Sequence, residues 1–247
     1  MSAVLTVLHT NDLHGHLDEF GAAALARLKA ELAPCLLLDS GDAVACGNVG
    51  WHRRGERLHE LMNGAGYDAA ALGNREFHFR PGPQAAKASL ARFPLLCANL
   101  LAPPGYGGLR PAATLNIEGW PPIRVFGLLV PMVTDQMWAR RLSPARFGPP
   151  AEAAVRVLAS LDGALPLCLS HLGAARDREL AAACPSLPLI LGGHSHTLLD
   201  PPERVGQTVI TQNRPYGGSL TKVRLRLDAG RVVVESAEWL PFPSKGG

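Results

Sequence analysis

Seven residues whose side chains can bind metals each come shortly after an apolar run of the sequence. They are two aspartates, one asparagine and four histidines: Asp12, His14, Asp42, Asn74, His171, His194 and His196. Mixed carboxylate and imidazole ligands suit Mn, Fe, Zn or Ni better than Ca or Mg alone. Seven ligands are too many for one catalytic ion with open positions. They suit two ions about 3.5–4 Å apart that share a bridging carboxylate, as in two-metal hydrolytic sites.

Such residues need a scaffold that brings distant segments together, and the hydrophobic pattern indicates one. Short apolar runs alternate with segments of helical periodicity, which is typical of an α/β fold with buried strands. The expected strands are residues 4–9, 35–39, 68–72, 94–99, 123–130, 165–170, 187–192, 208–211, 222–227 and 232–236. The expected helices are residues 21–33, 56–66, 84–93, 151–161 and 176–183. Because ligands bind beyond the carboxyl ends of strands in such sheets, we expect the seven side chains to converge at one edge.

Composition and charge narrow the class of protein. The chain has 247 residues, of which 47% are hydrophobic and 18% charged, as in a folded, soluble protein. A net charge of +3 without a basic stripe predicts no nucleic-acid partner. The N-terminus has no secretory pattern and no apolar run is long enough to cross a membrane, so we expect a cytoplasmic protein without a membrane partner. The five cysteines lack CxxC spacing and are expected to be thiols in a reducing compartment.

The polar blocks together resemble those of a known family. LHTNDLHGHL, LLLDSGDA, LGNREF, SHLG and LILGGHSHT match, in order and spacing, the five motifs of the calcineurin-like metallophosphoesterases. Within that family they look most like the catalytic domain of 5′-nucleotidases, and the resemblance runs from about Val4 to Leu227. Each block alone is a weak signal, but the five in sequence are highly specific.

The resemblance implies a fold, a ligand set and a reaction. The fold would be a four-layer α-β-β-α sandwich of two mixed sheets flanked by helices. Two divalent ions would be bound, with manganese favoured and Fe, Zn, Ni or Co as alternatives. A hydroxide held between the ions would attack phosphorus. One ion would take Asp12, His14 and His196, the other Asn74, His171 and His194, and Asp42 would bridge them. Asn74 and His14 are also candidates for direct catalytic roles.

One block departs from the family pattern. Family members usually read Gly-Asn-His-Glu-Phe-Asp, in which the histidine protonates the leaving oxygen and the aspartate orients it. Here those two positions hold Arg75 and His78. An arginine keeps its proton near pH 7, so it cannot act as a general acid, but it can bind a phosphoryl oxygen. Three interpretations stay open: Arg75 clamps phosphate while turnover is slowed or shifted, His78 has become the acid, or the site binds ligands with little turnover.

The length is the second departure. Family 5′-nucleotidases carry a C-terminal domain that clamps the nucleobase, and no segment of this sequence resembles it, so residues 1–247 are interpreted as a single catalytic domain. A small phosphate ester or a nucleotide is the expected substrate, and the oligomeric state is left open. Two alternatives remain: a metal-dependent binding or regulatory relative, and a hydrolase redirected to phosphodiesters, phosphonates or sulfur-containing esters.

Several other polar or aromatic residues have a structural interpretation. His9 and His16 flank the first block, and both are expected to be structural or solvent-facing. Residues 51–54 are expected to form a solvated loop, and His59 to lie on the surface of a helix. Tyr216 follows an expected strand near the motif edge, so it is the aromatic residue to test for substrate contact.

Overall fold

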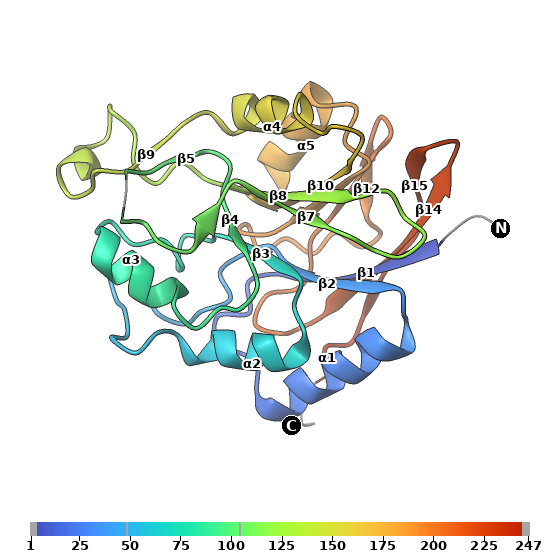
Figure 1. Cartoon of the computed structure of the whole chain (residues 1–247), viewed down its shortest axis with the longest axis horizontal. Coiled ribbons are helices and arrows are strands. Elements are labelled where there is room, and N and C mark those ends of the chain that lie inside the picture. The colour runs from blue at the N-terminus through green and yellow to red at the C-terminus, as the bar shows by residue number, and fades with distance from the viewer. Residues whose placement is uncertain (1–3, 48, 104, 244–247) are drawn as a thin grey trace.

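The computed structural model describes residues 4–47, 49–103 and 105–243. Two large sheets lie face to face, and helices cover their outer faces (Figure 1). A small third sheet pairs β5 (Leu100–Leu101) with β9 (Arg146–Phe147). The layers run helix, sheet, sheet, helix, so the expected four-layer α/β sandwich of two mixed sheets is confirmed.

The first sheet has seven strands in the order β15-β14-β1-β2-β3-β4-β6. Neighbours from β1 to β6 are parallel, while β14 and β15 run antiparallel at one edge. The strands are β1 (Val4–Thr10), β2 (Cys35–Asp39), β3 (Ala69–Ala71), β4 (Leu95–Leu96), β6 (Leu109–Arg110), β14 (Leu220–Asp228) and β15 (Arg231–Leu240). Helices α1 (Glu19–Glu31) and α2 (Arg57–Ala65) pack on its outer face, and α3 (Pro81–Ala88) follows β3 in the chain.

The second sheet has six strands in the order β12-β13-β11-β10-β8-β7. The inner four are parallel and the two edge strands are antiparallel. The strands are β7 (Ala112–Leu115), β8 (Ile123–Leu129), β10 (Leu165–His171), β11 (Leu189–Gly192), β12 (Glu203–Val205) and β13 (Thr208–Thr211). Helices α4 (Pro150–Leu158) and α5 (Ala174–Ala183) cover its outer face, and a 3₁₀ turn, η1, spans Trp138–Arg141.

Side-chain alternation along the strands forms the layers. In β2, Leu36 and Leu38 point into the core between the two sheets, whereas Leu37 points toward α1 and α2. This period of two follows from the pleat of a strand. Strand β14 alternates differently, since Val223 and Leu225 are buried while Arg224 is exposed, as the KVRLRL pattern predicts. Burial on both faces explains why the central parallel strands read as continuous apolar runs.

Helix α3 begins three residues before the start expected from the sequence and ends at Ala88 rather than at residue 93. Pro81 and Pro83 occupy its first turn, where a missing N–H costs nothing because those donors have no intrahelical partner. Strands β5, β6, β7, β9 and β12 were also missed, and four of them are only two or three residues long.

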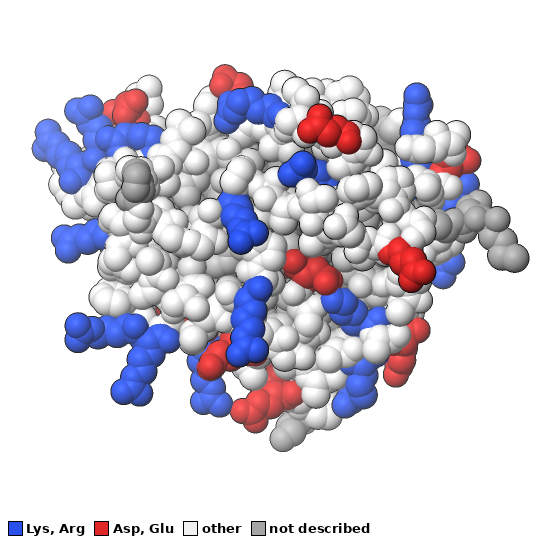
Figure 2. Space-filling model, viewed as in Figure 1, with Lys and Arg blue, Asp and Glu red and all other residues white. Residues whose placement is uncertain are grey.

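On the face shown in Figure 2, basic side chains are spread out with acidic ones among them rather than gathered in one continuous stripe. Among the described residues, no helix has both the length and the apolar character required to cross a membrane.

The expectation that His59 lies on the surface is wrong. Its side chain is 1% exposed, because Leu58, His59 and Met62 form the inward face of α2. The ring packs edge-on against Phe93, with centroids 5.9 Å apart. Burial lowers the pKa of His59 from 6.5 to about 4. The folded protein therefore holds a neutral imidazole here at pH values where the unfolded chain takes up a proton.

His59 is expected to contribute to acid sensitivity. Below pH 6.5 the imidazole of His59 binds a proton in the unfolded state, whereas in the folded state it stays neutral down to about pH 4. The free energy of unfolding therefore falls as the pH drops from 6.5 to about 4. Replacing His59 with leucine should reduce the loss of unfolding free energy between pH 7 and pH 5 by about 2 kcal/mol. Urea unfolding with a chelator present measures this difference. The exposed His16→Leu variant is the control, and equal losses in wild type and His59→Leu would contradict the prediction.

Candidate metal centre

The strand ends bring the seven candidate ligands together. Asp12 and His14 follow β1, Asp42 follows β2 and Asn74 follows β3, all in the first sheet. From the second sheet, His171 is the last residue of β10, and His194 and His196 follow β11. Both sets of parallel strands end on the same side, so the two sheets supply ligands to one place.

The first group consists of Asp12, His14 and His196. The Nε2 atoms of His14 and His196 are 3.0 Å apart. Asp12 Oδ1 lies 3.9 Å from His14 Nε2 and 3.4 Å from His196 Nε2. The other carboxylate oxygen, Oδ2, accepts from Asn11 Nδ2 and from the backbone N–H of His194. Within the part of the chain that the structure describes, Oδ1 is buried and has no hydrogen-bond donor.

The second group consists of Asn74, His171 and His194. Asn74 Oδ1 lies 3.2 Å from His171 Nε2 and 3.1 Å from His194 Nδ1. Asp42 lies between the two groups: its Oδ1 is 3.4 Å from His171 Nε2, and suitable ligand atoms of Asp42, Asp12 and His171 fall within 4.8 Å of one another. Asp42 thus lies near residues of both groups of candidate ligands.

The protonation of His171 follows from its neighbours. Its Nδ1 lies 2.7 Å from the carbonyl oxygen of Ser40, which can only accept, so Nδ1 carries a proton. Nε2 is then the atom that faces Asn74 and Asp42. Burial alone would lower the pKa of His171, but the Asp42 carboxylate outweighs it and raises the pKa to about 9. The centre thus stabilises a positive charge on Nε2, and a metal cation at that position would replace this proton.

Burial keeps two other imidazoles neutral. It lowers the pKa of His14 and of His194, so each ring can offer a lone pair. For Asp42, burial opposes ionisation, but the hydrogen bond and charge of His171 hold its pKa below the usual value. The donor set therefore fits divalent metal ions: neutral imidazoles, ionised carboxylates and a buried oxygen of Asp12 that lacks a donor among the described residues.

The backbone is strained where the ligands sit. Asp12, His14, Asp42, His194 and His196 all have positive φ values, between 48° and 76°. Residues other than glycine rarely adopt this region, and such strain of about 1–3 kcal/mol each is concentrated at functional sites. The surrounding structure holds these loops in place and so positions the candidate ligands.

Glu76 is one source of that support, and the sequence analysis did not single it out. Its buried carboxylate accepts backbone N–H bonds from Gly73, Asp42 and Val44, each 2.9 Å long. The carboxylate therefore ties the loop after β2 to the loop after β3. Burial raises the pKa of Glu76. An acid inside the LGNREF block was the available signal, but only the structure shows that it faces backbone donors.

Gly73 is required where these two loops touch. A Cβ at this position would lie 2.1 Å from Asp42 N and 2.6 Å from Glu76 Oε2. Gly73→Ala is expected to displace Asp42, to weaken metal binding and to cost about 3 kcal/mol or more of stability through overpacking. Gly64→Ala is the matched control, because Gly64 lies in α2 with open space around it and should gain about 0.5–1 kcal/mol. Denaturant unfolding of both variants tests the pair, and a mild effect at Gly73 would contradict this geometry.

Arg75 lies beside the centre. Its backbone N–H donates to Asp42 Oδ1 at 2.7 Å, and its side-chain Nη1 donates to the carbonyl of Ala45 at 2.7 Å. The guanidinium Nε is 3.9 Å from Asp42 Oδ2, and the side chain is 35% exposed. Its charge also reaches His14, whose pKa it lowers after the larger effect of burial. The guanidinium cation of Arg75 is thus held beside the carboxylate of Asp42.

His78 lies apart from the other candidates. Its Nδ1 accepts from the backbone N–H of Arg80 at 3.0 Å, and its own backbone N–H donates to Gln84 Oε1. Among the described residues, no hydrogen bond or ion pair joins His78 to the seven candidate ligands. The buried ammonium of Lys87, which donates to the carbonyls of Gly47 and Arg75, lies nearby and lowers the pKa of His78 after burial. The structure therefore gives His78 no contact with the place where a leaving group would be.

Tyr216 lies at the centre's edge, as its position in the sequence suggested. Its ring centroid is 4.9 Å from that of His14, 5.5 Å from that of His196 and 5.4 Å from that of His16. Its backbone N–H donates to Asp12 O, and its side chain is about half exposed.

His9, in contrast, is buried and structural: its Nε2 bonds the hydroxyl of Ser40, the residue whose carbonyl orients His171.

Comparisons with known proteins identify the family. The family model described as calcineurin-like phosphoesterase matches residues 5–198. The chain is 30% identical over 276 residues to the trifunctional nucleotide phosphoesterase protein YfkN of Bacillus subtilis, a match that covers 93% of this chain and 18% of that protein. It is 31% identical over 221 residues to protein UshA of Escherichia coli, covering 77% and 40% respectively.

A solved structure has the same fold. The 5′-nucleotidase precursor of Thermus thermophilus superposes with a TM-score of 0.81 at 27% identity, covering 97% of this chain and 55% of that one. The chain thus spans less than two thirds of the length of each of these relatives. The family model nevertheless covers most of the chain, including the blocks that hold the candidate ligands. The resemblance inferred from the motifs is confirmed, and the chain belongs to the calcineurin-like phosphoesterase family.

Proposed function

We propose that this protein is a binuclear metal-dependent hydrolase of phosphate esters, similar to 5′-nucleotidases. One observation carries the proposal: seven metal-binding side chains from five strand ends gather in two groups, with Asp42 between them. The names of the relatives support the substrate class, since YfkN is described as a nucleotide phosphoesterase and the Thermus protein as a 5′-nucleotidase precursor.

Two divalent ions would be held by these residues. Asp12, His14 and His196 would bind one, and Asn74, His171 and His194 the other, with Asp42 bridging. When bound, such ions supply Lewis-acid charge for phosphoryl oxygens and make a water acidic enough to serve as nucleophile. Manganese is the ion that the family resemblance favours, although imidazole and carboxylate ligands accept several metals.

Arg75 would bind the phosphoryl group. Its guanidinium Nε lies 3.9 Å from Asp42 Oδ2, and its side chain is partly exposed to solvent. A planar guanidinium forms two parallel hydrogen bonds to phosphate oxygens, and its charge stabilises the negative charge that builds up during transfer. His14 and Asn74 lie beside the same place and would contact the leaving group or the nucleophilic water.

Neither of the residues at the family's dyad positions is placed to protonate the leaving oxygen. Arg75 keeps its proton, and His78 is bonded to Arg80 away from the candidate ligands. Losing a general acid costs about 10²–10⁴-fold in rate, and the cost is greatest for poor leaving groups such as an alcohol. The proposed enzyme should therefore prefer esters whose leaving group is stable as an anion.

A second candidate function is binding or regulation with little turnover, and the displaced His78 favours it. A metal-dependent assay separates the two. We expect hydrolysis of p-nitrophenyl phosphate that requires added Mn²⁺ and stops with a chelator. Bis(p-nitrophenyl) phosphate, assayed beside it, tests whether the activity has been redirected to diesters. Binding of two metal ions without hydrolysis of either ester would favour the binding protein.

A further inference from the structure

A second cluster of potential ligands lies outside the centre described above. Cys46, His52 and Glu56 belong to the segment between β2 and α2, and ligand atoms of all three fall within 4.8 Å of one another. The Cys46 thiol donates to Glu56 Oε1 at 3.1 Å, and His52 Nδ1 lies 3.0 Å from Glu56 Oε2. A thiol, an imidazole and a carboxylate therefore point toward one another.

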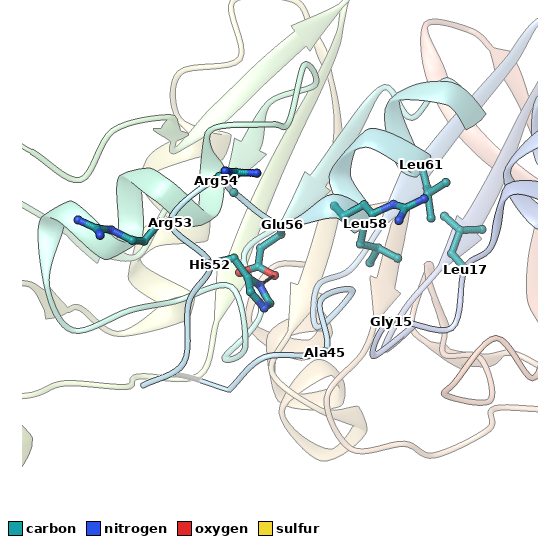
Figure 3. A pocket seen from close by; sticks show the side chains of 11 residues that line it. Gly15, Leu17, Ala45, His52, Arg53, Arg54, Glu56, Leu58 and Leu61 are labelled. Carbon is teal, nitrogen blue, oxygen red and sulfur yellow. Dashed lines mark hydrogen bonds and ion pairs between the residues drawn. The ribbon is translucent and has the colours of Figure 1, made fainter.

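The cluster is accessible to an ion from solvent. Glu56 is almost buried, whereas the His52 side chain is 67% exposed. Both residues line a cavity of about 590 Å³, together with Gly15, Ala45 and the apolar side chain of Leu58. Figure 3 shows His52 and Glu56 side by side in this cavity, with Arg53 pointing away from them.

We propose that Cys46, His52 and Glu56 form a separate site for a thiophilic divalent ion of the Zn²⁺ class. Zinc bonds of about 2.3 Å to sulfur and about 2.0–2.1 Å to nitrogen or oxygen place tetrahedral ligands about 3.3–3.6 Å apart. Cys46 Sγ and His52 Nδ1 lie 3.1 and 3.0 Å from the two different oxygens of Glu56, and one ligand atom from each of the three residues falls within 4.8 Å of the others. The side chains must therefore adjust to reach this spacing. Three protein ligands would leave a fourth position for water or another small ligand.

An ion that binds to the cluster must displace the proton of the Cys46 thiol. Burial, followed by the hydrogen bond to Glu56, raises the pKa of Cys46 to about 11, so without metal the thiol is protonated. Metal binding breaks the S–H bond, forms a metal–sulfur bond and releases that proton to solvent. The resulting thiolate and the Glu56 carboxylate then balance the two charges of the ion. The nearby Lys87 ammonium is already engaged by the carbonyls of Gly47 and Arg75, and it stabilises the thiolate.

This site adjoins the main centre but does not depend on it. Ala45, directly before Cys46, accepts the hydrogen bond from the Arg75 guanidinium. Lys87 bonds the carbonyl of Arg75 and that of Gly47, directly after Cys46. An ion bound by Cys46 would therefore fix the segment against which Arg75 rests. Metal binding by Cys46, His52 and Glu56 is independent of which reaction the main centre catalyses.

Titration of the whole chain with Co²⁺ tests the site directly. The seven ligands of the main centre include no cysteine, so a thiolate-to-cobalt charge-transfer band in the near ultraviolet reports on a cysteine ligand. We expect the band in wild type and its loss in the nearly isosteric Cys46→Ser variant. Cys184→Ser, which removes a thiol elsewhere, should keep the band. His52→Ala should weaken cobalt binding at this band by at least about 10-fold, as loss of a ligand or its support does.

Two results would overturn the inference. If the wild-type protein binds cobalt without any thiolate band, the cluster does not bind metal and only hydrogen-bonds the segment before α2 to Glu56. A band that persists in Cys46→Ser shows that another thiol is the ligand. Because His52 is exposed, His52→Ala is expected to fold even if a substitution at Cys46 does not, and unchanged cobalt affinity in this variant would also count against the site. Circular dichroism of each variant checks the fold.

Discussion

Asp42→Asn is expected to lower turnover of p-nitrophenyl phosphate by about 10³-fold or more and to reduce the bound metal below two ions per chain. Losing an outer partner of a metal ligand already costs about 10–100-fold, and a shared ligand should matter more. Asp42 lies between the two groups of donors, is ionised because His171 holds its pKa down, and also accepts the backbone N–H of Arg75. Asparagine keeps the shape but removes the charge that a bridging ligand needs.

The control for this substitution lies three residues earlier. Asp39 is also buried, but burial raises its pKa, and it accepts from Thr10 and Gly41 rather than facing the histidines. Asp39→Asn should therefore keep both metals and most of the activity. Metal analysis by mass spectrometry and steady-state kinetics on both variants provide the comparison. An Asp42→Asn protein with two ions and near-normal turnover would refute the bridging assignment.

Arg75→His is expected to raise kcat/KM for AMP by about 10²-fold, within the 10²–10⁴-fold range of general acid catalysis. The arginine side chain extends past Asp42 toward the carbonyl of Ala45, so an imidazole on the same backbone would lie beside the centre. At neutral pH it could protonate a ribose oxygen, whereas the guanidinium cannot. No gain is expected for p-nitrophenyl phosphate, because its leaving group needs no proton and the variant also lacks the guanidinium that would bind the phosphoryl group.

Arg75→Ala tests the other role proposed for this residue, which is to bind the phosphoryl group. Without the guanidinium, kcat/KM for p-nitrophenyl phosphate should fall by about 10²-fold, the typical cost of losing one preorganised charge-stabilising donor. Arg146→Ala is the matched control, because Arg146 pairs with Asp135 on the surface. If Arg75→His leaves the AMP rate unchanged and Arg75→Ala has no effect on the aryl ester, Arg75 does not take part in the reaction.

The sequence predicted the strand ends well because the central strands are buried on both faces. Apolar runs such as 35–39 and 165–170 have no competing interpretation, and the polar residues that follow them lie where the sheets end. The two-residue strands β4, β5, β6 and β9 have too few side chains to show a period.

Tertiary contacts explain the other misses. Nothing local distinguishes His59 from a surface histidine, because its burial depends on Phe93, which is distant in the sequence. The carboxylate of Glu76 and the carbonyl of Ser40 act through bonds to loops or strands far along the chain. For His78 the motif likewise did not reveal its partners, which are the backbone N–H of Arg80 and the side chain of Gln84. Residue type and spacing identify a candidate ligand, but they do not reveal the direction of its side chain.

Turnover of p-nitrophenyl phosphate and AMP by the manganese-loaded protein, measured side by side, tests the central claim most directly. We expect the aryl ester to be cleaved and kcat/KM for AMP to be lower by at least about 10²-fold, because the metal centre works without a proton donor. Equal and rapid cleavage of both would show that another residue supplies the proton. Cleavage of neither, with two ions bound per chain, would contradict the claim that this centre is a phosphoesterase site.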